Sequence, residues 1–155
     1  MNEQIRSTRA GDLDGLKEVL DSSELFPSEY LDELIAGYLT DPETEENWFT
    51  GLQDGQIVGL GYCIPEKLTE GTYNLLAIAV RKELQGKGWG KRMMEYIEGV
   101  LIEKSARVLI VETSGDEQYA STRKFYETLG YRKEAVIRDF WKEGEDKVIY
   151  WKKLS

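Results

Sequence analysis

The sequence predicts an α/β (α+β) protein, in which a mixed and mostly antiparallel sheet of about seven strands is flanked by about four helices. Apolar residues alternate along the chain between strand spacing and helical spacing, in the order β α α β β β α β α β β. The 155 residues suit a single domain over 1–155, and 41% hydrophobic with 32% charged residues is an ordinary globular composition.

The first three elements are predicted to be a strand and two helices. Ile5–Thr8 has the character of a short strand, and Asp12 is expected to cap the helix that follows it. The second helix begins at Pro27 and ends at Asp41, before a proline. Its apolar side chains recur at helical spacing, at Tyr30, Leu31, Leu34, Ile35, Tyr38 and Leu39.

A meander of three strands is predicted next. Asp54 and Gly55 form a hairpin signal between the apolar segments Trp48–Gln53 and Gln56–Ile64. Thr72–Val80 is expected to form the third strand. Cys63, the single cysteine, lies within the second of these strands, so we expect a buried apolar residue there and not a catalytic thiol.

The second half of the chain is predicted to alternate helices and strands and to close with two strands. The short segment Val108–Glu112 is nearly all apolar, which is typical of a strand buried between helices. The other expected elements are a helix from about Gly88 to Lys104, a helix from about Ala120 to Leu129 ended by Gly130, and strands at Tyr131–Arg138 and Lys147–Lys153.

Composition excludes several classes of function. The chain has no histidine, which removes the usual general base, the Ser-His-Asp triad and most zinc sites, so no metal is expected. A formal net charge of −9 disfavours nucleic-acid binding. The longest apolar run is too short to span a membrane, and the N-terminal residues have no apolar signal region, so we expect a cytoplasmic protein without a membrane partner.

A glycine-rich segment from Gln85 to Lys91 follows the third strand of the meander and opens a helix. Backbone N–H groups at such a position suit a pyrophosphate, because they lie at the positive end of the helix dipole. A Walker A loop is excluded, because the residue five positions before Gly90-Lys91 is Gln85 and not glycine. A dinucleotide fingerprint is excluded too, because the glycines are Gly86, Gly88 and Gly90.

Two motifs resemble those of the GNAT superfamily of acetyl-CoA-dependent N-acetyltransferases. Gln85-Gly86-Lys87-Gly88-Trp89-Gly90 resembles the acetyl-CoA loop of that family, Q/R-x-x-G-x-G/A. Phe125-Tyr126-Glu127-Thr128-Leu129-Gly130-Tyr131 resembles its F-Y-x-x-L-G-F/Y segment. With the element order, the resemblance covers essentially the whole chain. It implies a GNAT-like fold with a splay between strands 4 and 5, acetyl-CoA as co-substrate, and an acyltransferase activity.

The resemblance also implies which residues bind coenzyme A. Loop amides would bind the pyrophosphate, one amide near Ile78 or Ala79 would polarise the thioester carbonyl, and Arg123 would reach the adenosine end. The family often has Asn where this chain has Tyr119, so that contact is open. The implied set is Ile78, Ala79, Val80, Gln85, Gly86, Lys87, Gly88, Trp89, Gly90, Lys91, Tyr119 and Arg123.

Tyr126 is the predicted general acid, because a phenol of pKa about 10 is close to the leaving thiolate, whose parent pKa is about 8.5. The acceptor amine has to lose a proton, and without histidine the candidate bases are carboxylates. Glu112, at the end of the apolar strand, is our first choice. The alternative is that Glu112 is a solvated glutamate at a strand end.

The resemblance implies that the acceptor pocket is built from the region between the first two helices and from the last β-hairpin, here Ser22–Tyr30 and Arg138–Asp146. Both segments mix aromatic and acidic residues, and from them we select Phe26, Tyr30, Asp139 and Trp141. Such a lining suits a cation, so the predicted acceptor is a small cationic amine or a protein amine side chain. The alternative is that these segments are ordinary solvated loops. A non-catalytic acyl-CoA sensor of the same fold also stays open. Because dimers are common in the family, a homodimer is a further expectation.

Overall fold

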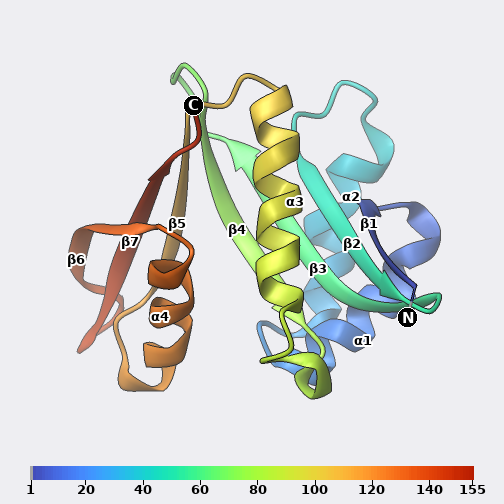
Figure 1. Cartoon of the computed structure of the whole chain (residues 1–155), viewed down its shortest axis with the longest axis horizontal. Coiled ribbons are helices and arrows are strands. Elements are labelled where there is room, and N and C mark those ends of the chain that lie inside the picture. The colour runs from blue at the N-terminus through green and yellow to red at the C-terminus, as the bar shows by residue number, and fades with distance from the viewer. Residues whose placement is uncertain (1) are drawn as a thin grey trace. The chain divides into compact units, whose positions relative to one another are not determined.

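The computed structural model describes residues 2–155, in which seven strands form one sheet of order β1-β2-β3-β4-β5-β7-β6 (Figure 1). β4 and β5 pair in parallel, whereas the pairs β1–β2, β2–β3, β5–β7 and β6–β7 are antiparallel. The predicted mixed, mostly antiparallel sheet is therefore confirmed. The strands are β1 (Glu3–Ser7), β2 (Asn47–Gln53), β3 (Gln56–Pro65), β4 (Thr72–Val80), β5 (Val108–Ser114), β6 (Arg132–Lys142) and β7 (Glu145–Lys153).

Four α-helices accompany these strands over the described residues, as predicted. They are α1 (Leu13–Ser23), α2 (Leu31–Thr40), α3 (Trp89–Glu103) and α4 (Ala120–Thr128). A short 3-10 turn, η2 (Ser28–Tyr30), precedes α2, so the α-helix itself begins later than the proline signal predicts. No helix within residues 2–155 combines the length and the apolar character needed to cross a bilayer.

The last hairpin is longer than its sequence predicts. β6 continues to Lys142 and β7 begins at Glu145, whereas the expected strands stop at Arg138 and start at Lys147. The added residues are mostly charged and have little strand propensity of their own. Their pairing, such as Lys142 opposite Glu145, comes from the turn that joins the two strands.

The chain divides into two compact units, which we describe separately. The N-terminal unit extends to Ile64 and includes Leu76–Val100, and the C-terminal unit comprises Pro65–Leu75 and Leu101–Ser155. The first residues of β4 therefore belong to the C-terminal unit, and the rest of the strand belongs to the N-terminal unit.

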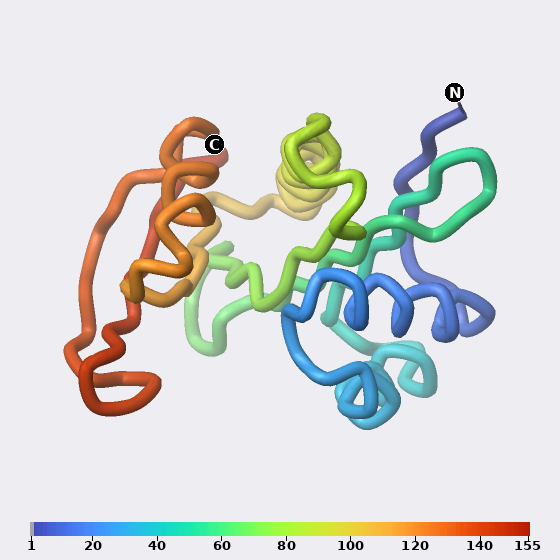
Figure 2. Tube along the Cα trace, turned by 90° about the horizontal axis from the view of Figure 1, so that it is seen from below, coloured from blue at the N-terminus to red at the C-terminus, as the bar shows by residue number. Residues whose placement is uncertain are grey.

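In the N-terminal unit, helices cover both faces of the strands β1–β3 (Figure 2). α1 and α2 lie on one face, where they bury Leu16, Leu20 and Ile35 against a cluster that includes Trp48 and Leu60. α3 lies on the other face, where small residues on the strands let it approach. A Cβ atom at Gly51 would lie 2.9 Å from the Trp89 ring, and one at Gly61 would lie 2.9 Å from Ile97. Glycine is needed there because the helix packs directly on the strand backbone.

In the C-terminal unit, a group of tyrosines links α4 to the strands. Tyr126 on α4 contacts the rings of Tyr131 and Tyr150, with centroid distances of 5.8 and 6.0 Å. The Tyr150 hydroxyl donates to Glu127 at 2.8 Å, and burial together with this carboxylate raises the pKa of Tyr150 to about 12. Lys152 donates to the Leu129 carbonyl at 2.9 Å and so holds the end of α4.

The buried carboxylate of Asp12 holds the segment that leads into α1. It does not cap α1 as expected. It accepts from two nitrogens of Arg6 at 2.7 and 3.0 Å, from the Arg9 amide at 2.9 Å and from Thr50 at 3.0 Å. Burial alone raises the pKa of Asp12. The hydrogen bonds from Arg6, Arg9 and Thr50 outweigh it and hold that pKa below its ordinary value of 3.8.

Asp12→Asn is expected to lower the free energy of unfolding at pH 7 by about 2 kcal/mol, because charged hydrogen bonds to a buried group are lost. A depressed pKa gives stability that is complete above about pH 4 and disappears as the pH falls through the folded pKa. The difference between wild type and variant should therefore shrink below pH 4 in urea denaturation. Asp14→Asn, at an exposed position of α1, is the matched control. A pH-independent difference would contradict this account.

Candidate functional site: a run of free amides and a bulged strand

The glycine-rich segment leaves a series of backbone amides without a protein partner. The Gln85 amide donates to Lys82 at 3.2 Å, and the Arg92 amide donates to Gly88 at 3.1 Å. Between them, no amide from Gly86 to Lys91 donates to a backbone or side-chain acceptor within residues 2–155. Since α3 begins at Trp89, the last of these amides also lie at the positive end of the helix dipole.

Two glycines give this segment its shape. Gly86 and Gly88 have φ values of +76° and +88°, in the left-handed region that other residues avoid. Left-handed glycines help to turn successive amides towards one side, as in an anion-binding nest. A Cβ atom at Gly88 would lie 2.7 Å from a terminal nitrogen of the flexible Arg92 side chain, which can move aside. The backbone conformation, and not the space, therefore requires glycine at this position.

The side chains of Gln85 and Trp89 hold the loop in place. The Gln85 side chain donates to the Val80 carbonyl at 3.0 Å, at the end of β4. The Trp89 indole is buried and donates to Gln53 on β2 at 2.9 Å. Both residues were predicted to bind the cofactor, and their side chains are committed to the protein. Their main chains alone remain available to a ligand.

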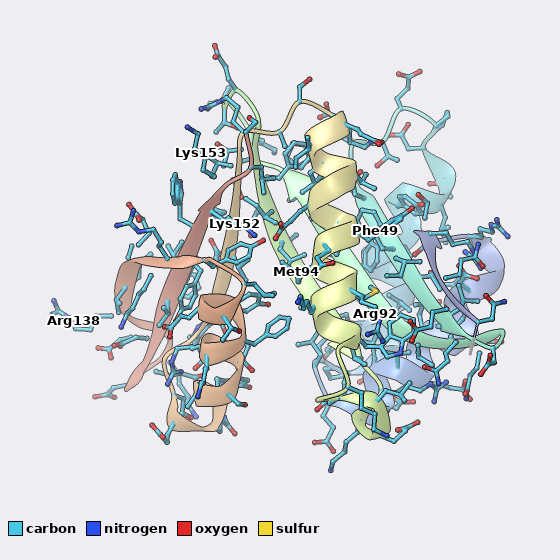
Figure 3. The ribbon with its side chains drawn as sticks, in the orientation of Figure 1. Phe49, Arg92, Met94, Arg138, Lys152 and Lys153 are labelled. Carbon is cyan, nitrogen blue, oxygen red and sulfur yellow. The ribbon has the colours of Figure 1, made fainter. Side chains whose placement is uncertain are left out.

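Among the cations of the loop, Arg92 bonds both β1 and the loop itself, where it donates to the Lys87 carbonyl at 3.5 Å. Its guanidinium pairs with Glu3 at 2.9 Å and lies over the Trp89 ring at 5.1 Å (Figure 3). Lys87 and Lys91 are exposed. Lys91 lies 3.9 Å from Glu95 in a solvent-exposed pair that contributes little. These two lysines are therefore the mobile charges of the loop.

Arg81 and Ser22, which the sequence analysis did not select, connect α1 to the start of the loop. Arg81 donates from its side chain to Ile57 at 2.8 Å and to Glu18 at 3.1 Å. The Ser22 hydroxyl accepts from the Lys82 amide at 2.8 Å. No motif marks these residues, because their partners lie far away in the sequence.

The main chain of β4 changes direction before it reaches the loop. In a regular strand, alternate residues point their N–H and C=O groups to the same neighbour. The Gly71 carbonyl accepts from Arg107, which leads into β5, at 2.7 Å, whereas the Arg81 amide donates to Val58 on β3 at 2.9 Å. Gly71 and Arg81 are an even number of residues apart, so in a regular strand both would bond the same neighbouring strand. Because they bond opposite neighbours, β4 contains one extra residue between them, which is a β-bulge.

After this bulge, the main-chain groups of Ile78 and Val80 point away from β3. Gln85 bonds the Val80 carbonyl from that side, which agrees with the assignment. The pairing of β4 with β5 runs only from Thr72 opposite Val108 to Leu75 opposite Val111. Of the predicted residues Ile78, Ala79 and Val80, the first and the third therefore place N–H groups on the side that faces away from β3.

Tyr126, the predicted general acid, is almost completely buried in the C-terminal unit, at 4% exposure. Its ring packs edge-on against Phe125 and Tyr131 and is tilted against Tyr150, and burial raises the pKa of its hydroxyl above the ordinary value. No hydrogen bond from this hydroxyl occurs in the part of the chain that the structure describes. The side chain is therefore held in position and keeps its proton.

Glu112, the predicted general base, forms an ion pair. Its carboxylate lies 3.0 Å from the ammonium group of Lys147, which in turn lies 3.9 Å above the Phe140 ring. Both side chains are mostly buried, at 24% and 10% exposure. The Glu112 carboxylate therefore already has a cationic partner within the chain, and its role as a base stays a prediction. Residues 2–155 contain no group of acidic, cysteine or histidine side chains suited to a metal.

Arg123 and Tyr119 flank the start of α4. The Arg123 guanidinium donates to the carbonyls of Ser114 and Asp116, at 2.7 and 2.8 Å. It therefore closes the loop between β5 and α4 and does not extend into solvent as expected for a contact with adenosine. Tyr119 is 38% exposed at the end of a 3-10 turn.

The four predicted acceptor residues fall in different units. Phe26 packs against the core cluster of the N-terminal unit, and Tyr30 is exposed in the same unit. Asp139 and Trp141 belong to the C-terminal unit, where Trp141 packs edge-on against Phe140 at 4.8 Å and the Asp139 carboxylate accepts from Gly144 at 3.0 Å. Their assembly into one pocket stays a prediction.

Known proteins with similar sequences and structures agree on one family. A sequence model of the acetyltransferase (GNAT) family matches residues 13–131. A protein of Methanocaldococcus jannaschii named as an uncharacterized N-acetyltransferase is 26% identical over 150 residues, which cover 96% of this chain and 90% of that protein.

Solved structures have the same fold. A crystal structure from Desulfovibrio desulfuricans, described as an acetyltransferase of the GNAT family, is 28% identical and superimposes with a TM-score of 0.92 over 99% of this chain and 100% of that one. An aminoglycoside 6'-N-acetyltransferase complexed with coenzyme A, at 14% identity, superimposes with a TM-score of 0.74 over 98% of this chain and 97% of that one. The chain is an acetyltransferase and belongs to the GNAT family.

Proposed function

We propose that this chain acts as one N-acetyltransferase domain, which transfers the acetyl group of acetyl-CoA to a primary amine in a ternary complex. The observation that carries the proposal is the run of free amides from Gly86 to Lys91, at the start of α3. Backbone N–H groups without partners at the start of a helix favour an anion, and the diphosphate of coenzyme A is such an anion. The acetyltransferase family of the chain supports the same ligand.

The residues present fit such a ligand. Left-handed Gly86 and Gly88 expose the amides without covering them by side chains, and Lys87 and Lys91 are exposed beside them. The Ile78 amide, which points away from β3 after the bulge, is our proposed donor to the thioester carbonyl oxygen. The bound co-substrate would supply the activated acetyl group and the thiolate leaving group.

Tyr126 is the proposed proton donor to the leaving sulfur. A phenol of ordinary pKa about 10 lies roughly 1.5 units above a thiol, so complete proton transfer costs about 2 kcal/mol in water. Burial raises the pKa of Tyr126 further. A thiolate held in the same apolar surroundings would become more basic for the same reason, so the mismatch stays small. The raised pKa also ensures that the donor is protonated at neutral pH.

The proton of the acceptor amine requires a base, and Glu112 remains our proposal for it. Its carboxylate is paired with Lys147 at 3.0 Å. The proton of the amine would reach it directly or through a water relay.

The proposed acceptor is a small cationic amine or an amine side chain of a protein. The formal net charge of −9 attracts cations over the whole surface. Exposed aromatic residues, among them Tyr30 and Trp141, offer ring faces to a cation in the segments predicted to contact the acceptor.

The direct test is release of coenzyme A thiol from acetyl-CoA over a panel of cationic, neutral and anionic amines. We expect turnover with cationic primary amines and several-fold lower kcat/KM with neutral ones. Turnover of neutral or anionic amines alone would reject the acceptor class. Thermal stabilisation by coenzyme A, with no thiol release for any amine including peptides, would instead indicate a binding module.

Gly88→Ala is expected to weaken coenzyme A binding at least tenfold in calorimetry, because a Cβ atom strains the left-handed backbone that presents the amides. Binding of pantetheine, which lacks the diphosphate, should stay unchanged. Gly99→Ala on α3 is the matched control, since no atom lies within 4 Å of a Cβ atom there. Equal loss for both ligands would show that the variant acts on the fold and not on the diphosphate site.

Tyr126→Phe is expected to lower kcat about 100-fold, since it removes a general acid, while the Kd for coenzyme A changes less than threefold. Because the pKa of Tyr126 is raised, the donor is competent below that value and fails above it. The wild-type kcat should therefore show no decline due to Tyr126 below about pH 10. A decline near pH 8 that disappears in the variant would contradict this assignment.

Glu112→Gln, measured in the same assay, separates the two roles of the carboxylate. If Glu112 is the base, the wild-type kcat/KM should fall at low pH, and this fall should be absent in the variant. An unchanged pH profile in the variant would remove Glu112 from the mechanism, and an unchanged melting temperature shows that loss of the Lys147 pair leaves the fold intact.

A further inference from the structure

Tyr126 lies on a short helix that depends on the rest of the C-terminal unit for its position. α4 has nine residues, and a helix of this length is marginal without support from its surroundings. It packs on the strands of the C-terminal unit (Figure 1), and Tyr126 is the one residue of α4 that is buried. The direction of the Tyr126 side chain therefore depends on how α4 is attached to these strands.

A closed circuit of contacts joins Tyr126 to Tyr150 on β7. The two rings are tilted against each other, with centroids 6.0 Å apart. The hydroxyl of Tyr150 donates to the Glu127 carboxylate at 2.8 Å. Because Glu127 directly follows Tyr126 in the chain, Tyr150 contacts the Tyr126 ring with its own ring and holds the adjoining backbone with its hydroxyl.

This hydrogen bond joins a completely buried tyrosine to an exposed residue of the helix. Burial and the carboxylate raise the pKa of Tyr150 to about 12, so its hydroxyl remains protonated and able to donate at neutral pH. A second bond, from Lys152 to the Leu129 carbonyl at 2.9 Å, holds the end of α4 but leaves the helix able to rotate about its axis. The bond between Tyr150 and Glu127 limits that rotation.

We propose that Tyr150 and Glu127 are positioning residues for Tyr126: their hydrogen bond sets the rotation of α4 and so directs the Tyr126 hydroxyl. The inference rests on the proposed function, in which Tyr126 protonates the leaving sulfur. Over residues 2–155 this hydroxyl has no hydrogen bond of its own, so packing and the orientation of α4 determine its place. A small rotation of the helix displaces the end of so long a side chain, and a shift of about 1 Å can lower a rate about 100-fold.

The test compares variants that keep or remove this bond with little change in volume. Tyr150→Phe removes the donor and Glu127→Met removes the acceptor, and each should lower kcat about tenfold. Glu127→Gln keeps an acceptor oxygen and should stay within about threefold of wild type. The Kd for coenzyme A should change less than threefold in all of them, since the proposed amide donors lie between Ile78 and Lys91, in the other unit. Tyr96→Phe, at a 37% exposed position of α3, is the matched control and should leave kcat unchanged.

A double-mutant cycle with Tyr126→Phe separates positioning of Tyr126 from a general effect on the fold. In the Tyr126→Phe background, Tyr150→Phe should lower kcat less than twofold, because the hydroxyl that it directs is gone. A tenfold loss in both backgrounds, or no loss in either, would overturn the inference.

Amide hydrogen exchange adds a measurement that needs no turnover. The amides of α4 should exchange several-fold faster in Tyr150→Phe and Glu127→Met than in wild type and Glu127→Gln. Equal exchange in all four chains would also overturn the inference. A wild-type chain that acetylates no amine rejects the proposed function, and with it the role of Tyr126. An active wild type that gives any of the contrary results rejects the positioning role alone.

Discussion

Backbone groups in a folded protein must find hydrogen-bond partners, and this chain leaves a connected stretch of them unpaired. Within residues 2–155 the amides from Gly86 to Lys91 have no acceptor, and after the bulge in β4 the main chain of Ile78 faces away from β3. An unsatisfied backbone donor is unfavourable unless solvent or a ligand meets it. Several side chains of the N-terminal unit hold these groups in position.

The side chains around the loop serve this purpose from the protein side. Trp89 is buried and bonded to Gln53, Gln85 holds the end of β4, and Arg92 is paired with Glu3. None of them needs to touch a ligand in order to matter. They fix the backbone on which the proposed recognition depends. The proposed binding by main-chain donors would explain why the segment contains several glycines and few reactive side chains.

The C-terminal unit supplies ionisable groups whose properties depend on burial. Burial raises the pKa of the Tyr126 hydroxyl, and Glu112 is paired with Lys147. The same ammonium group also lies over the ring of Phe140. Lys147 therefore contacts an acidic and an aromatic side chain, neither of which is among the four residues predicted to contact the acceptor.

The sequence by itself determined the order of elements, the antiparallel character of the sheet and the positions of the glycine loop and of Tyr126. These follow from local spacing, turn residues and short motifs, which act within a few residues of the chain. Tertiary structure alone decided that Asp12 bonds Arg6 and Thr50, and that Arg123 closes its own loop. It also decided that Arg81 and Ser22 support the start of the glycine-rich segment. It also decided that Glu112 meets Lys147. These side chains bond whichever partner lies near them in the folded chain. A local sequence pattern cannot show which distant residue that will be.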